Sequence, residues 1–191
     1  MNDTRQERGD SFPGEFPELA DENRRIWNAN ARWWDDRIGD RNKFQERLIE
    51  PGTERLLRVA AGDIILDVAC GAGRFARRIA SLDEIRFTKA VCTMALMDMP
   101  EIAPLFRALA RQLPIDGTLV FSVAHPCFHS AAVGPLATLL RAGFDAGFVL
   151  DGLEEPIFQE TGIPTPGVRW TDMPDVPPVL IARLKLVSKS G

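Results

Sequence analysis

The sequence has no excess of basic residues and no long apolar run. Its 191 residues include 23 Lys+Arg against 27 Asp+Glu, which gives a net charge of −4. A nucleic-acid interface usually needs clustered positive charge, so this balance argues against a nucleic-acid partner. No apolar stretch approaches the ~18 residues of a membrane-spanning helix, and the polar, acidic start does not resemble a signal peptide. We therefore expect a cytoplasmic protein that does not span a membrane.

Cysteine is also scarce. The three cysteines, Cys70, Cys92 and Cys127, are widely spaced and form no C-x-x-C pair. That spacing is not typical of a disulfide framework or of a zinc site. It indicates reduced thiols and no bound metal.

The length fits one domain. Residues 1–20 are rich in charge and show no hydrophobic period, so we expect a flexible tail followed by a single domain over residues 21–191. At the start of this domain, Asp21 can cap a helix. Four apolar residues then recur at helical spacing, namely Trp27, Ala31, Trp34 and Ile38.

This helix has two interpretations. Its tryptophans lie over the core as a lid, or Trp33 or Trp34 leans over a ligand site. The second interpretation rests on the attraction between an aromatic face and a cation.

The remaining chain is organised around one stretch. Residues 64–68 form an apolar run broken by one carboxylate, Asp67, as in a buried parallel strand. Gly71 and Gly73 permit a sharp turn and a close approach of the backbone to a ligand. From Arg74 the spacing is helical, so a ligand over the turn would meet the N–H groups of a helix start.

Two kinds of cofactor fit such a turn. Gly71-x-Gly73 followed by Ala76 matches the loose dinucleotide fingerprint, which would indicate an NAD(P)-binding oxidoreductase. Asp67, however, would face the turn from the end of the strand. A carboxylate there repels a pyrophosphate and attracts an ammonium or a sulfonium.

The run from Asp67 to Gly73 resembles motif I of the class I, seven-strand (Rossmann-like) S-adenosylmethionine-dependent methyltransferases. The pattern of that motif is an acid followed by three alternating glycines, and Ala69 stands at the first glycine position. The resemblance implies an α/β fold: a mostly parallel sheet with helices on both faces and an N-terminal helical lid. It also implies S-adenosylmethionine as cofactor and a small-molecule methyl acceptor. The cofactor-binding residues that it implies are Asp67, Ala69, Cys70, Gly71, Gly73, Ala95, Leu96, Met97 and Trp34.

The rest of the chain predicts four more strands, over residues 90–94, 118–123, 148–150 and 179–186. By resemblance they are the fourth, fifth, sixth and last strands of the family's sheet, and the last is antiparallel. Helices are expected over 44–48, 53–60, 102–113 and 135–142, with stops before Pro51 and at Gly62 and Gly143. The segments Cys92–Met99 and His125–Phe128 look like a bacterial small-molecule branch of the same family.

Two strands and two helices of that family have no room in this chain. Only residues 81–89 separate the helix that follows motif I from the family's fourth strand, residues 90–94. Residues 84–87 could be a vestigial strand. The acid that holds the cofactor ribose should follow motif I by ~20 residues. No acid occurs from Ile85 to Met97, so this anchor is missing.

The shortened connection poses a topological problem, because parallel crossovers are right-handed in ~98% of cases. Three arrangements would resolve this problem. The helix after motif I lies elsewhere than in the family, the chain makes a left-handed crossover, or a partner chain supplies the missing part, as in a homodimer. We expect strain or poor packing in this region.

His125 is the catalytic candidate. It ends the fifth strand at the carboxyl edge of the sheet, where open α/β folds bind ligands. A histidine there can take a proton from a hydroxyl or an amine. The alternative is a structural histidine bonded to a backbone carbonyl in the turn before Pro126.

Three functions remain open from the sequence. The first is a working methyltransferase for a small molecule. The second is a shortened, catalytically impaired methyltransferase-like domain that serves as a binding or interaction module. The third is the NAD(P)-binding oxidoreductase.

Overall fold

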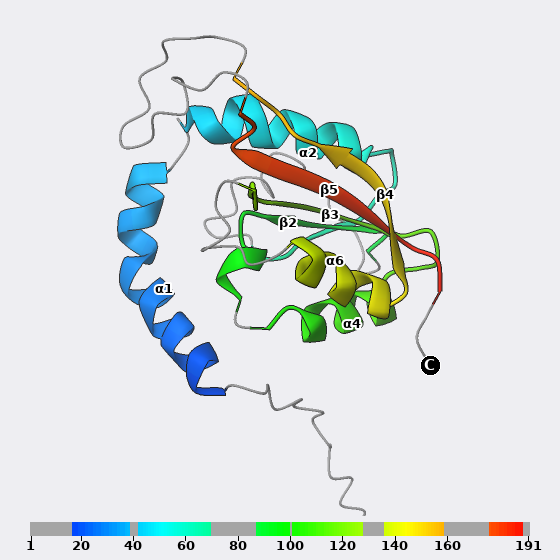
Figure 1. Cartoon of the computed structure of the whole chain (residues 1–191), viewed down its shortest axis with the longest axis horizontal. Coiled ribbons are helices and arrows are strands. Elements are labelled where there is room, and N and C mark those ends of the chain that lie inside the picture. The colour runs from blue at the N-terminus through cyan, green and yellow to red at the C-terminus, as the bar shows by residue number, and fades with distance from the viewer. Residues whose placement is uncertain are drawn as a thin grey trace, which may run out of the picture.

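The structure, a computed structural model, describes residues 17–38, 42–69, 87–99, 101–127, 136–158 and 176–188. In these residues a five-stranded sheet lies between helices on both of its faces (Figure 1). Helix α2 (Glu50–Leu57) covers one face, and α4 (Ala103–Gln112) and α6 (Leu136–Asp145) cover the other. The predicted α/β architecture is confirmed.

The strands are β1 Ile65–Asp67, β2 Lys89–Thr93, β3 Thr118–Ala124, β4 Phe148–Glu154 and β5 Val179–Leu186. Their order in the sheet is β1-β2-β3-β5-β4. β1, β2 and β3 are parallel, whereas β5 is antiparallel to both β3 and β4. The predicted antiparallel last strand is confirmed, and so is the shortened sheet within the described residues. The first helix, 74–82, and the predicted strain around it lie outside those residues.

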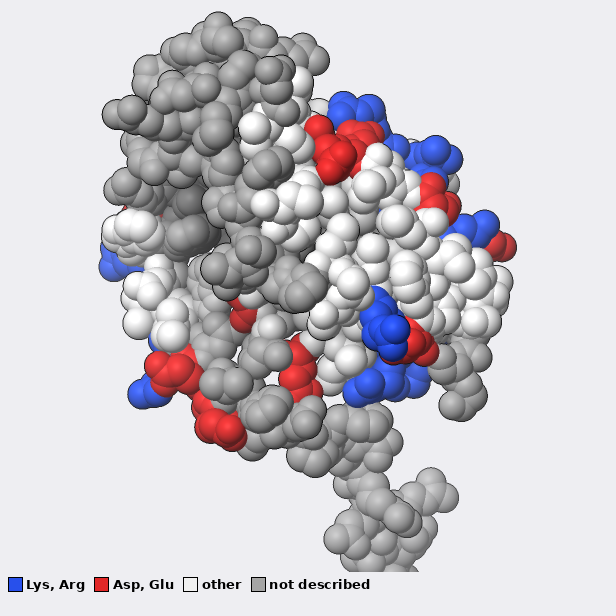
Figure 2. All heavy atoms as spheres, viewed as in Figure 1, with Lys and Arg blue, Asp and Glu red and all other residues white. Residues whose placement is uncertain are grey.

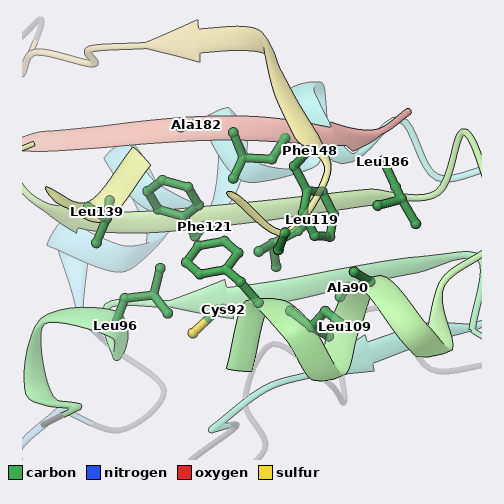
Figure 3. Close-up of a cluster of buried hydrophobic side chains, with 14 of the residues drawn as sticks. Ala90, Cys92, Leu96, Leu109, Leu119, Phe121, Leu139, Phe148, Ala182 and Leu186 are labelled. Atoms are coloured by element: carbon green, nitrogen blue, oxygen red, sulfur yellow. The ribbon is translucent and has the colours of Figure 1, made fainter. Parts of the chain in front are cut away.

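The larger hydrophobic core lies on the face covered by α4 (Ala103–Gln112) and α6 (Leu136–Asp145) (Figure 3). Phe106 of α4 meets Phe148 of β4 edge to face, with ring centroids 6.1 Å apart. α6 continues through Gly143, so the predicted stop there is wrong. A Cβ at Gly143 would lie 2.7 Å from Leu184 Cδ1. The missing side chain therefore lets α6 lie close against the sheet.

The opposite face is covered by a continuous helical segment, in which the π-helix η1 (Gln45–Ile49) runs directly into α2 (Glu50–Leu57). The predicted break before Pro51 is wrong. The Glu50 N–H already bonds to the Gln45 carbonyl across the wide π turn. Pro51 then occupies the start of α2, where a backbone N–H has no helical partner to lose.

The end of α2 also differs from expectation. The helix closes at Arg58, whose φ of 48° is left-handed and whose N–H bonds to the Glu54 carbonyl at 3.0 Å. The chain therefore leaves the helix before Gly62. The buried cluster under α2 consists of Ile49, Leu56, Leu57, Val91, Val120, Val179 and Ile181.

A buried arginine ties α2 to the sheet. Arg183 of β5 donates from Nε to the Asp151 carboxylate at 2.6 Å and from Nη1 to the Leu56 carbonyl at 3.0 Å. Asp151 lies at the point where the register between β4 and β5 shifts. The arginine thus links the irregular part of β4 to the end of α2.

Helix α1 (Pro17–Ile38) begins four residues before Asp21, so Asp21 is not its cap and the last part of the predicted tail is helical. Trp27 and Trp33 remain 36% and 55% exposed. Within the described residues, α1 contributes to neither core cluster. The choice between the two interpretations of this helix stays a prediction. The side chain of Trp34 lies outside the description.

Acidic and basic side chains are interspersed over the described part of the face shown in Figure 2, near α2 and β4. One such pair joins Arg55 Nη2 of α2 to Glu154 Oε2 of β4 at 2.6 Å. No helix in the described ranges is long and apolar enough to cross a membrane.

Candidate functional site

The candidate site is the edge of the sheet at which β1, β2 and β3 end. Parallel strands bring their carboxyl ends to one edge, so the residues after Asp67, Thr93 and Ala124 gather there. β4 runs in the same direction as β3, because both are antiparallel to β5. The residues after Glu154 therefore belong to the same edge.

The backbone is unusual where the first two strands end. Ala69, two residues after β1, has φ 57°, and Met94, directly after β2, has φ 53°. Residues other than glycine seldom adopt this left-handed conformation, and such positions cluster at ligand sites. Ala69 thus takes the conformation that glycine favours, at the position where the motif predicts a glycine.

Asp67 ends β1 and is half-buried. Directly after it, the Val68 N–H bonds to the Val91 carbonyl at 2.8 Å, which holds the end of β1 against β2. The negative charge of Asp67 acts on Cys92 in the neighbouring strand β2. Burial, reinforced by the negative charge of Asp67, raises the pKa of the Cys92 thiol to about 12. Cys92 therefore stays protonated and serves as an apolar packing residue.

The end of β2 is pinned to β3. The Met94 N–H donates to the Ser122 carbonyl at 2.9 Å, and the 3-10 helix η2 (Leu96–Asp98) follows. Leu96 is 1% exposed and belongs to the core, whereas Ala95 and Met97 are half-buried. Of the three predicted contact residues here, Leu96 could offer a ligand only its backbone.

His125 is buried, with 4% of its surface exposed. Its Nε2 lies 2.6 Å from Glu155 Oε1, and its Nδ1 accepts a bond from the Cys127 N–H at 3.3 Å. The His125 N–H also donates to the Pro178 carbonyl at 3.0 Å. The ring thus contacts a carboxylate and a backbone amide. A base role for His125 would have to pass through Glu155.

Glu155 was not identified from the sequence. Its side chain is 49% exposed and stands directly after β4. The prediction ended this strand near Leu150, four residues too early. The signal that could have found it is the acidic pair Glu154-Glu155, at the carboxyl end of a strand parallel to β3.

The remaining predicted contact residues cannot be placed. Cys70, Gly71 and Gly73 lie outside the described residues. The structure thus brings Asp67, Ala69, Ala95, Met97 and His125 to one edge of the sheet.

The comparisons with known proteins bear on the fold. No protein-family model and no curated protein matches the chain. The N-methyltransferase NodS from Bradyrhizobium japonicum, in complex with S-adenosyl-L-homocysteine, is 15% identical with a TM-score of 0.58, covering 89% of this chain and 99% of NodS. An S-adenosylmethionine-dependent methyltransferase from Mesorhizobium loti is 19% identical with a TM-score of 0.54, covering 71% of this chain and 96% of the other.

At these identities the likeness shows the fold alone. The chain has the Rossmann-like fold of class I methyltransferases in a shortened form. Its order β1-β2-β3-β5-β4 corresponds to the first, fourth, fifth, last and sixth strands that the sequence predicted.

Proposed function

We propose that the chain is an S-adenosylmethionine-dependent methyltransferase that acts on a small molecule. The observation that carries the proposal is the end of β1. A half-buried carboxylate, Asp67, is followed two residues later by Ala69 in a conformation typical of glycine. This combination of charge and close-approach backbone suits a cationic cofactor better than a pyrophosphate.

The chemistry of these residues fits the cofactor. Asp67 can accept hydrogen bonds from an amino group, and the backbone around Ala69 can approach a ligand closely. Met94 to Met97 would flank it from the next strand. When bound, S-adenosylmethionine supplies a methyl group activated by its sulfonium, so the protein mainly has to align the acceptor and exclude water. The base role of His125 stays a prediction.

Two alternatives compete with this proposal. The first is a catalytically impaired binding module, because the acidic residue that would hold the cofactor ribose is missing. The second is an NAD(P)-binding oxidoreductase, because the sequence matches the loose dinucleotide fingerprint. Neither NodS nor the Mesorhizobium loti enzyme supports these alternatives, since both are methyltransferases by their descriptions.

Titration calorimetry with S-adenosylhomocysteine separates the three functions. We expect micromolar or tighter binding to the wild-type chain. Asp67→Asn should weaken it roughly ten- to hundredfold, because a hydrogen bond to a charged group is lost. No heat would indicate the binding module, and selective binding of NAD would indicate the oxidoreductase.

Asp116→Asn is the matched control. Asp116 lies in the turn before β3, at the opposite edge of the sheet, where it pairs with Lys185 Nζ at 2.7 Å. The substitution makes the same change of charge, and asparagine tolerates the φ of 67° at this position. Binding of S-adenosylhomocysteine should be unchanged. The predicted homodimer is tested separately, by light scattering on the purified chain.

A further inference from the structure

We propose that the Glu155 carboxylate, anchored on the buried imidazole of His125, binds a cationic nitrogen of the methyl acceptor. The acceptor would then be an amine that carries an apolar group. This inference rests on the proposed function, since it assigns the substrate class of the same site. It depends on four features of the carboxyl edge.

The first feature is accessibility. His125 is 5% exposed at its side chain and Glu155 is 49% exposed, while Nε2 and Oε1 lie 2.6 Å apart. A molecule arriving from solvent therefore reaches the carboxylate and not the ring. The histidine occupies one acceptor position of the carboxylate, which has further lone pairs to offer a ligand.

The second feature is the tautomer of the histidine. A backbone N–H can only donate, so the bond from Cys127 N requires Nδ1 to be the acceptor. The ring proton then lies on Nε2 and points at Glu155. A neutral ring donates this bond without cancelling the carboxylate charge, so the pair keeps a net negative charge.

The third feature is the contrast with the other carboxylates of this strand. Asp151 is paired with Arg183 at 2.6 Å, and Glu154 is paired with Arg55 at 2.6 Å. Both are neutralised by an arginine within the fold. Glu155 has a histidine as its partner among the described residues. At this end of β4, the negative charge of Glu155 is therefore the one that no arginine of the described residues neutralises, and it can attract a cationic ligand.

The fourth feature is the apolar surface next to it. Leu153 and Ile157 flank Glu155 in sequence and are 47% and 42% exposed. The next residue along the chain, Phe158, is buried, and its ring centroid lies 6.3 Å from that of Phe44. A negative group between exposed aliphatic side chains suits a cation with an apolar substituent.

Benzylamine and benzyl alcohol are the probes, because they share the apolar group and differ in charge. Binding to the full chain is followed by NMR titration. We expect the amine to bind more tightly than the alcohol. Glu155→Gln should weaken benzylamine binding roughly three- to tenfold, as expected for a half-exposed charge pair, and leave benzyl alcohol unchanged. Glu154→Gln is the control, and its ratio of benzylamine affinity to benzyl alcohol affinity should equal that of the wild type.

The imidazole of His125 gives a second readout. The chain has 2 His, so the nitrogen spectrum of His125 is assigned with His129→Gln. We expect the Nε2–H tautomer, and a shift of the Nε2 signal with benzylamine but not with benzyl alcohol. Wild-type protein that prefers the alcohol, or an amine preference that survives Glu155→Gln, would overturn the inference.

The two proposals can fail separately. Glu155→Gln should bind S-adenosylhomocysteine as the wild type does, since Glu155 is assigned to the acceptor. If the cofactor binds normally but the affinity for benzylamine does not depend on Glu155, the amine site alone is rejected. A Glu155-dependent amine site in a chain that gives no heat with S-adenosylhomocysteine rejects the methyltransferase and keeps the amine site.

Discussion

Strand β1 differs from β3 and β5 in how deeply it is buried. β3 is buried from Leu119 to Val123, and β5 is buried at every residue except Lys185. β1 has three residues, all of them half-buried. The features assigned to the cofactor nevertheless lie at the ends of β1 and β2. Buried contacts are therefore concentrated in β3 and β5, while the proposed cofactor end includes the less buried β1, as is common for ligand sites.

The largest effect should come from a matched pair of core substitutions. Leu119 of β3 and Leu66 of β1 both pair with Ala90 of β2, from opposite sides. Leu119 is fully buried and Leu66 is half-buried. We expect Leu119→Ala to lower the free energy of unfolding by about 3–5 kcal/mol and Leu66→Ala by about 1–2 kcal/mol. Urea denaturation measures both, and equal losses would contradict the contrast between β1 and β3.

A smaller effect should appear at the other end of β1, where Asp63 holds this strand to β2. Burial by itself would raise the pKa of Asp63. Hydrogen bonds from Lys89 at 2.5 Å, from the Ala60 N–H and from Thr88 outweigh it, so the pKa lies below its ordinary value. A lowered pKa stabilises the fold above the unfolded pKa, and this stability is lost as the pH falls through the folded pKa.

Asp63→Asn should therefore lower the free energy of unfolding by about 1–2 kcal/mol near neutral pH. The difference from the wild type should shrink as the pH falls from the unfolded pKa of about 4 through the lower pKa of Asp63 in the folded chain. Thermal melts of both chains across this range measure it. A difference that stays constant with pH would show that the charge of Asp63 contributes nothing.

The smallest effect is expected at the unusual turn after β1. Ala69→Gly should raise the free energy of unfolding by about 0.5–1 kcal/mol, because relief of the left-handed conformation outweighs the added freedom of the unfolded chain. Ala95, with an ordinary φ of −121°, is the control at the same edge. Ala95→Gly should instead lower stability by about 0.5–1 kcal/mol. A loss of stability at both positions would show that the left-handed conformation of Ala69 is not strained.

The sequence was most informative where one pattern dominates. The apolar run at 179–186 predicted the bounds of β5, and amphipathic spacing predicted α4 to within a residue at each end. Prediction failed where a local signal was overridden. Pro51 stands at a helix start that a π turn made available, and Gly143 lies inside α6 because the sheet needs the space.

The site was predicted only in part. Asp67 was found because a charge inside an apolar strand is conspicuous. The partner of His125 was missed because it lies 30 positions away in sequence, and the sheet order that brings β4 beside β5 cannot be read from local spacing. Long-range pairings of this kind leave no periodic signal.

Hydrogen–deuterium exchange with and without S-adenosylhomocysteine tests the central claim most directly, because it reports where the ligand lies. We predict slower exchange in peptides that cover residues 65–69 and 93–97, at the ends of β1 and β2, with little change in α6. Protection confined to β4 and β5, or no protection anywhere, would contradict the placement of the cofactor at the ends of β1 and β2.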